Sequence, residues 1–109
     1  MKTRKEFLSG TLSTIILGLL KENDKMYGYE ICQVTKQRTN NEIVLTMGAI
    51  YPSLYKLEKE GYIKSSKEIV NGRSRKYYSL NPTTINDIDN RIASLLNFSQ
   101  NITNLLKIS

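Results

Sequence analysis

Three cations lie together in one short stretch of the chain, Asn71-Gly72-Arg73-Ser74-Arg75-Lys76. The Asn-Gly dipeptide supplies the positive φ angles of a tight turn, and the flanking runs Tyr62 to Val70 and Arg75 to Leu80 have the composition of paired strands. Cations around a hairpin tip can bind phosphate or enter a minor groove. Such residues also protect exposed strand edges, but concentration of positive charge at one turn favours contact with a polyanion.

A second segment with binding chemistry runs from Met47 to Glu60. Its apolar residues Ile50, Leu54 and Leu57 recur at helical spacing and should face the core, which predicts a helix with Thr46 as its N-cap. The remaining surface presents small, aromatic and basic side chains. These are the candidates for contact with DNA: Met47, Gly48, Ala49, Tyr51, Tyr55 and Lys56.

The side chains on this surface differ in what they can do. Small residues let a double helix approach closely, and a lysine can reach a phosphate or a guanine edge. The tyrosines can bond phosphate or touch thymine methyl groups, but they can equally pack between helices with the hydroxyl at the surface. Pro52 removes one backbone hydrogen bond, so we expect the first turn of the helix to be kinked or displaced.

Several classes of chemistry are excluded by composition. The chain has no histidine and one cysteine, Cys32, so a histidine base, a Ser/His or Cys/His dyad and every histidine-containing metal site are excluded. Acidic residues occur at i, i+2 spacing, which directs the members of each pair apart. We therefore expect no catalytic residue, no metal site and no cofactor. The net charge of +6, from 16 Lys and Arg against 10 Asp and Glu, can attract a polyanion such as nucleic acid or serve solubility alone, so the placement of the cations decides between them.

The remaining apolar patterns predict the elements around these segments. Residues 7–21 and 27–38 have helical periodicity, Ile43 to Leu45 favours a short strand, and Gly61 fits the C′ position of the helix before it. The order is helix, helix, short strand, helix, hairpin and helix. This order predicts a mainly α, α+β fold: a winged helix-turn-helix of three helices and a two-stranded wing over residues 1–81, joined in one compact unit to a C-terminal dimerisation helix at 82–109.

The C-terminal helix has an apolar face of its own. After Asn81-Pro82 ends the hairpin, apolar residues alternate at steps of three and four, with Ser99 as the polar member of the seam. A chain this short gains much by burying such a face against a copy of itself. The expected interface residues on this helix are Ile85, Ile88, Ile92, Leu95, Ile102 and Leu106.

Three motifs resemble the PadR family of bacterial transcriptional regulators. Residues 27–31, Tyr-Gly-Tyr-Glu-Ile, are similar to the opening of the family's second helix. Residues 48–63, which include the internal Pro52, are similar to its third helix, and residues 72–80 to its wing. The chain departs from the family pattern at Ala49, where a Ser or Thr is usual, and at Leu95, near the place of the tryptophan of the multidrug-sensing branch.

The resemblance implies a homodimer in which the first helix, through Leu12 and Ile16, assists the C-terminal helix. It also implies a repressor whose DNA binding is relieved by a small molecule or another signal. The chain has no tryptophan, so the aromatic drug sandwich of the multidrug-sensing branch is not expected.

The function expected from the sequence is that of a cytoplasmic repressor that binds double-stranded DNA, with two half-sites about 34 Å apart on a near-palindrome. The alternative is a winged-helix module that binds protein and uses its charge for solubility. No membrane contact is expected, because the apolar run of residues 7–20 is too short to cross a bilayer. The basic arm Lys2, Arg4 and Lys5 either follows the DNA backbone or forms a disordered tail.

Overall fold

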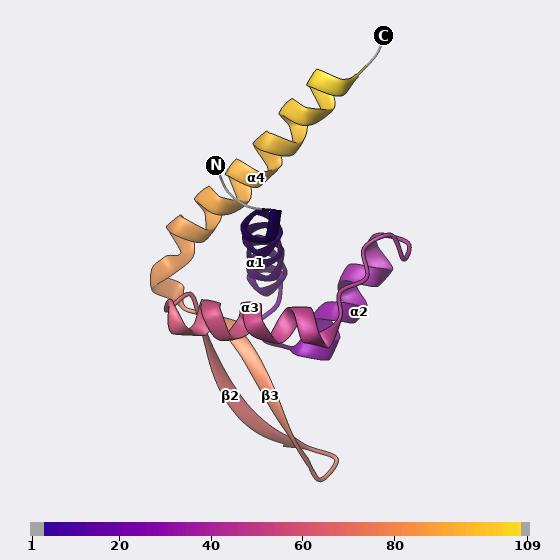
Figure 1. Ribbon diagram of the computed structural model, residues 1–109. Helices are drawn as coiled ribbons and strands as arrows, with labels where there is room; N and C mark the ends of the chain where they lie inside the picture. The colour runs from indigo at the N-terminus through magenta and orange to yellow at the C-terminus, as the bar shows by residue number, and fades with distance from the viewer. Residues whose placement is uncertain (1–3, 108–109) are drawn as a thin grey trace.

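The computed structural model describes residues 4–107, and the side chains of residues 10–107, so the side chains of the basic arm lie outside the described part. In chain order the elements are α1 (Arg4–Glu22), β1 (Met26–Tyr27), α2 (Gly28–Arg38), α3 (Met47–Lys59), β2 (Ile63–Val70), β3 (Arg73–Leu80), the 3-10 turn η1 (Pro82–Thr84) and α4 (Ile85–Leu106). The predicted mainly helical α+β fold with a hairpin wing and a long C-terminal helix is confirmed (Figure 1).

The small sheet has the strand order β1-β3-β2, with both pairs antiparallel. The prediction of a short strand at Ile43 to Leu45 is wrong, because this segment is part of the loop before α3. The third strand of the sheet is β1. The chain forms turns in this loop. Asn40 and Asn41 have positive φ angles, and the backbone amide of Ile43 donates a hydrogen bond to Thr39 Oγ1 at a distance of 3.0 Å. β-branched residues without a neighbouring strand cannot form a ladder.

The hairpin turn is the one that the sequence predicts. Asn71 and Gly72 have φ angles of 51° and 77°, so both central residues adopt the left-handed conformation that matches the twist of the strands. The two-residue turn pairs Val70 with Arg73 and fixes the register along the whole wing, from there to Ile63 opposite Leu80.

Helix α3 is defined by signals at both of its ends. Thr46 caps it, since its side chain accepts a hydrogen bond from the amide of Ala49 at 3.2 Å, and Gly61 beyond its C-terminus has a φ of 85°. The helix continues through Pro52 without interruption. Pro52 and Gly48 are both exposed, so water can satisfy the carbonyl that loses its usual donor.

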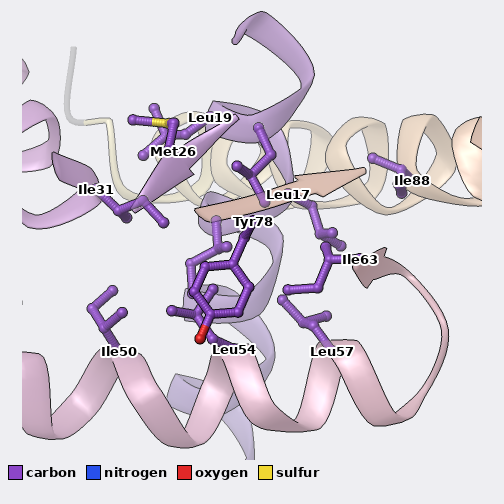
Figure 2. Close-up of a cluster of buried hydrophobic side chains, with 12 residues drawn as sticks. Leu17, Leu19, Met26, Ile31, Ile50, Leu54, Leu57, Ile63, Tyr78 and Ile88 are labelled. Atoms are coloured by element: carbon purple, nitrogen blue, oxygen red, sulfur yellow. The ribbon is translucent and has the colours of Figure 1, made fainter. Parts of the chain in front are cut away.

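The core lies where α1, α3, the sheet and the start of α4 meet. Figure 2 shows Tyr78 and Ile63 directed from the sheet toward Leu54 and Leu57 of α3, with Ile88 of α4 at the edge of the cluster. All five side chains are at most 4% exposed. Because α4 contributes Ile88 to this core, its first turns pack with the helices and the sheet that precede it.

Beyond its first turns, α4 leaves the body of the molecule (Figure 1). The protomer measures 56 × 32 × 26 Å. Its radius of gyration is 15.2 Å, which exceeds the value of about 13 Å for a compact domain of this length. Among residues 4–107, no helix is long and apolar enough to span a membrane.

Candidate nucleic-acid interface

The surface of α3 that faces away from the core carries most of the candidate DNA-binding residues. Gly48, Ala49 and Lys56 are exposed, and Tyr51 and Tyr55 are 50% and 70% exposed. Ile50, Leu54 and Leu57 on the other side of the helix are buried, as the spacing predicts. The helix therefore presents a wide polar surface with little bulk near its N-terminus.

Met47 and Tyr51 lie on the flank of α3 that contacts α2. The Sδ atom of Met47 is 3.6 Å from the Sγ atom of Cys32, so Met47 is partly buried. A Cβ atom at Gly28 would lie 3.2 Å from Met47 Cε and 3.7 Å from the Tyr51 ring. Gly28, which was not singled out from the sequence, thus leaves room for the Met47 side chain between the start of α2 and α3.

The wing has two chemically different faces, because side chains alternate along each strand. We call the face that carries the buried Ile63 and Tyr78 the inner face, since these residues pack toward α3 (Figure 2). The strand register places Ser65, Lys67, Ile69, Ser74 and Lys76 on the same face. The opposite, outer face carries Arg73, Arg75 and Tyr77.

Arg75 on the outer face is held by aromatic side chains. Its guanidinium carbon lies 4.1 Å from the centre of the Tyr27 ring, and Nη1 donates to the hydroxyl of Tyr77 at 3.5 Å. The hydrogen bond to Tyr77 raises the pKa of Arg75, which keeps the group charged. Tyr27 and Tyr77 meet edge to face with their ring centres 5.5 Å apart. Arg75 therefore connects the wing to the start of α2.

Glu58 of α3 connects the helix to both strands of the wing. Its Oε2 atom accepts a hydrogen bond from Ser65 Oγ at 2.5 Å, and its Oε1 atom lies 3.8 Å from Lys76 Nζ. From the sequence, the acidic residues were considered only as possible catalytic pairs, and this link was not predicted. No local signal marks it, since Ser65 and Lys76 belong to two different strands.

Positive charge remains uncompensated around α3 and the wing. Among the described side chains, several cations in this region have no carboxylate within ion-pair distance: Lys56, Lys59, Lys64, Lys67 and Arg73. They are spread over the outer surface of α3, both strands and the hairpin tip. This distribution suits a partner with repeated negative charges.

The residues expected at a dimer interface fall into three groups. Ile16 and Ile88 have no exposed surface, since both lie in the protomer's own core, and they cannot contribute contact area to a partner. Leu12, Ile85, Ile92 and Leu95 are partly buried. Ile102 and Leu106 are 38% and 70% exposed on the projecting part of α4, together with Leu96 and Leu105, which the predicted seam did not include.

These elements define a winged helix-turn-helix protein with an added C-terminal helix. A family model, the transcriptional regulator PadR-like family, matches residues 16–84. The chain belongs to this family. It is accordingly a transcriptional regulator and not an enzyme, as its sequence predicts.

Individual proteins are also similar to this chain. An uncharacterized protein of Lysinibacillus sphaericus is 37% identical over 78 residues, which are 71% of each chain. A transcriptional regulator from Clostridium thermocellum is similar with a TM-score of 0.80 and 30% identity over 94% of this chain and 99% of that one. Bacillus subtilis PadR in complex with operator DNA is similar with a TM-score of 0.65 and 29% identity over 72% of this chain and 45% of that one.

Proposed function

We propose that this regulator is a cytoplasmic repressor that binds a near-palindromic DNA operator as a homodimer. In this proposal α3 enters the major groove of each half-site, and the wing contacts the flanking backbone or minor groove. The observation that carries the proposal is the surface formed by α3 and the wing, which carries cations without a carboxylate partner among the described side chains. In Figure 1 the wing and the projecting end of α4 extend in opposite directions from the body of the protomer.

The chemistry of α3 supports contact with a base-pair edge. Gly48 and Ala49 leave room for the backbone of the helix to approach DNA, and Lys56 can reach a phosphate or a guanine. Tyr51 and Tyr55 each expose half or more of their surface, so their hydroxyls are available to phosphate oxygens. The operator-bound crystal structure of the Bacillus subtilis relative supports the same use of the shared fold.

The projecting half of α4 supports the homodimer. Leu105 and Leu106 are 76% and 70% exposed, and Leu96 is 64% exposed. Exposure of large apolar side chains to water is unfavourable. Burial of the same surface against a second copy stabilises the dimer by about 25 cal/mol per Å² of apolar area. Two protomers joined along α4 would present two copies of α3, which matches a DNA site with two-fold symmetry.

A small-molecule inducer is part of the proposal because a groove lies beside the proposed dimer helix. The groove between α1 and α4 has a volume of about 400 Å³ and is lined by Thr11, Thr14, Arg91, Ser94 and Phe98, among others. A ligand seated there would contact the helix that sets the arrangement of the two protomers. Leu95, near the place of the tryptophan of the multidrug-sensing branch, lines this groove together with Phe98.

The test is binding of the purified protein to DNA from upstream of its own gene and to a scrambled duplex, measured by fluorescence anisotropy across a salt series. We expect selective binding to the upstream DNA with affinity that falls steeply as salt rises, because phosphate contacts release counterions. Weak and equal binding to both duplexes would instead support a module that binds protein.

Two further measurements test the finer parts of the proposal. Sedimentation equilibrium should give twice the protomer mass at the concentrations used for DNA binding. A reporter gene placed behind the upstream DNA should be expressed less when the regulator is present, and increased expression would identify an activator. A screen for compounds that restore expression then addresses the inducer.

A further inference from the structure

A second groove lies between α2 and the loop that joins α2 to α3. Its volume is about 380 Å³, within the range of about 300–1,000 Å³ that is typical of small-ligand sites. One wall is a single face of α2, whose residues recur at helical spacing. These residues are Tyr29, Cys32, Gln33, Lys36 and Gln37. The loop forms the other wall through Asn41, Val44 and Leu45. In Figure 1 α2 and this loop extend upward from α3, and the wing extends downward.

The polar side chains of the groove suit an anion and an amide. Lys36 is exposed and has no carboxylate partner among the described side chains, and no Asp or Glu lines the groove. The side-chain amides of Gln33, Gln37 and Asn41 form no hydrogen bond within the described part of the chain. A primary amide has both donors and an acceptor, so it can pair with both polar groups of a peptide bond.

The groove also has apolar surface in contact with water. Val44 is 59% exposed and Tyr29 is 54% exposed. Cys32 and Leu45 are partly buried and pack against the core. One cavity therefore combines a free cation, unpaired amides and an apolar wall, which is the combination that fixes the orientation of a small amphipathic ligand.

We propose that this groove binds a short peptide, or an N-acylated amino acid, that ends in a free carboxylate and carries an apolar side chain. The carboxylate lies against Lys36, a peptide bond pairs with the amides of Gln33 and Gln37, and the apolar side chain packs on Val44. The sugar-phosphate backbone of DNA has the charge but neither the peptide bond nor an aliphatic group. The mixed chemistry of the groove therefore favours the peptide.

The groove is connected to the start of α3. Val44 and Leu45 directly precede Thr46, whose side chain caps the helix. The thiol of Cys32 lies 3.6 Å from the Sδ atom of Met47, the first residue of α3. A ligand held between α2 and the loop thus acts on the first turn of α3, and occupancy should change the affinity for the operator. This coupling rests on the proposed function, whereas binding of the peptide does not.

Cys32 allows occupancy of the groove to be measured directly, because it is the only cysteine of the chain and lines the groove. Burial raises the pKa of its thiol, so the thiol is protonated at neutral pH and serves as a reporter of access. Alkylation by N-ethylmaleimide is followed by mass spectrometry with and without N-acetyl-alanyl-leucine. We expect a Kd on the order of 10⁻⁴ M for this peptide. At about ten times the Kd, alkylation should be slower by roughly tenfold.

Three related compounds each lack one of the recognised groups. N-acetyl-alanyl-leucinamide lacks the charge, isocaproate lacks the peptide bond, and N-acetyl-alanyl-glycine lacks the apolar side chain. Each should bind about tenfold more weakly than N-acetyl-alanyl-leucine, the size expected when one charge-assisted hydrogen bond or one buried aliphatic group is lost. Equal protection of Cys32 by all four compounds, or protection by none at millimolar concentration, would overturn the proposal.

Two variants of the groove have matched controls nearby. Lys36→Gln should bind the peptide about tenfold more weakly and no longer distinguish it from its amide. Arg38→Gln is its control on the same helix, since Arg38 pairs with Glu22 and does not line the groove.

Val44→Ser should lose the preference for the leucyl over the glycyl peptide. Ile43→Ser is its control, because Ile43 is 42% exposed in the same loop but outside the groove. Both controls should be protected as the wild type is. Circular dichroism and thermal unfolding should show that the four variants keep the fold, since none of these residues lies in the core. Loss of protection in the controls as well as in the groove variants would place the peptide elsewhere.

The coupling to α3 is measured by anisotropy on the upstream operator fragment. Saturating N-acetyl-alanyl-leucine should change operator affinity by about fivefold or more, and by linkage the operator should change peptide affinity by the same factor. Lys36→Gln should remove the effect. An effect that persists in Lys36→Gln would show that the peptide acts from another site, such as the groove between α1 and α4. Protection of Cys32 with unchanged operator affinity would overturn the coupling.

The remaining outcomes separate this inference from the proposed function. If scrambled DNA protects Cys32, and Lys36→Gln makes the salt slope of DNA binding shallower by about 0.9, the groove holds a DNA phosphate and the proposal is wrong. Weak and equal binding of operator and scrambled DNA would overturn the proposed function, while protection of Cys32 by the peptide would still support the site. Selective operator binding without protection by the peptide would overturn this inference alone.

Discussion

At the scale of residues, the cations of the wing tip differ in what holds them. Arg75 is stacked on Tyr27, Lys76 is near Glu58, and Arg73 is exposed beside the turn with no carboxylate partner among the described side chains. A cation without an intramolecular partner loses least when it binds phosphate. Arg75, whose guanidinium is both stacked on the Tyr27 ring at 4.1 Å and hydrogen-bonded to Tyr77, contributes to the position of its strand instead.

This difference gives a prediction for three substitutions. Arg73→Ala and Lys76→Ala should each weaken binding on operator and scrambled DNA alike and make the salt slope shallower by about 0.9, because each loses a phosphate contact. Arg75→Ala should leave the slope closer to the wild-type value. The measurement is the anisotropy salt series, and unchanged affinity and slope for both Arg73→Ala and Lys76→Ala would remove the wing from the mechanism.

Tyr78 gives a prediction for stability at high pH. Its ring is 4% exposed between the sheet and α3, and burial raises the pKa of its hydroxyl. The neutral form is favoured in the folded state, so this stabilisation is complete below the ordinary tyrosine pKa of about 10 and is lost as pH rises through the raised value.

Urea unfolding at pH 8 and above pH 10 measures the effect. The wild type should lose more stability between the two pH values than Tyr78→Phe, which keeps the ring and removes the ionisable group. Tyr55→Phe is the matched control, since that ring is 70% exposed, and it should follow the wild type. Equal pH dependence for wild type and Tyr78→Phe would show that the pKa of Tyr78 is the same in the folded and unfolded states.

At the scale of elements, local signals were sufficient for some features. The Asn71-Gly72 turn, the Thr46 cap and Gly61 depend on a few neighbouring residues, and the structure has each where the sequence predicts it. The alternation of the inner and outer faces also follows from the turn: once Val70 pairs with Arg73, Lys67 must lie opposite Lys76. The position of Lys67 was therefore available from the sequence.

Other features depend on contacts between distant segments. β1 is only Met26–Tyr27, too short for a strand pattern, and it exists because β3 offers an edge. The stacking of Arg75 on Tyr27, and the space that Gly28 leaves for the Met47 side chain, also involve segments that are separated in the chain. Periodicity carries no information about such pairs, which explains why the strand was expected at Ile43 to Leu45 instead.

The cap of α3 gives the prediction for this scale. Thr46→Ala removes the acceptor for the Ala49 amide and should lower the free energy of unfolding by about 1 kcal/mol, whereas Thr46→Ser should retain most of it. Urea unfolding measures both variants. Because the cap lies at the end of α3 that carries Gly48 and Ala49, operator affinity should also fall in Thr46→Ala. An alanine variant as stable as the wild type would show that water replaces the cap.

At the scale of the whole molecule, the direction of α4 links dimer assembly to DNA binding. Ile88 is buried in the core, Tyr62 donates to Asp87 Oδ2 at 2.7 Å, and Lys21 pairs with Asp89 at 2.5 Å. The hydrogen bond to Asp87 raises the pKa of Tyr62, which keeps the donor protonated at neutral pH. These contacts come from α1, from the start of the wing and from the core, so they fix the angle at which α4 leaves the protomer.

In the proposed dimer this angle sets the distance between the two copies of α3, and the apolar seam of α4 sets the strength of the pair. Ile102→Lys places a charge in the seam and should convert the dimer to a monomer without unfolding the protomer, since Ile102 is 38% exposed and lies beyond the core. Affinity for the full operator should fall by about 10²-fold or more, because each α3 then binds its half-site alone.

Sedimentation equilibrium and anisotropy on full and single half-site duplexes measure this effect. Binding of Ile102→Lys to a single half-site should equal that of the wild-type protomer, so the loss appears only on the full operator. Asn104→Lys adds the same charge on the opposite side of the helix, where a residue two positions along is rotated by about 200°, and it should remain a dimer. If Ile102→Lys stays dimeric with full operator affinity, the protomers associate through a different surface, and the projecting half of α4 serves another partner.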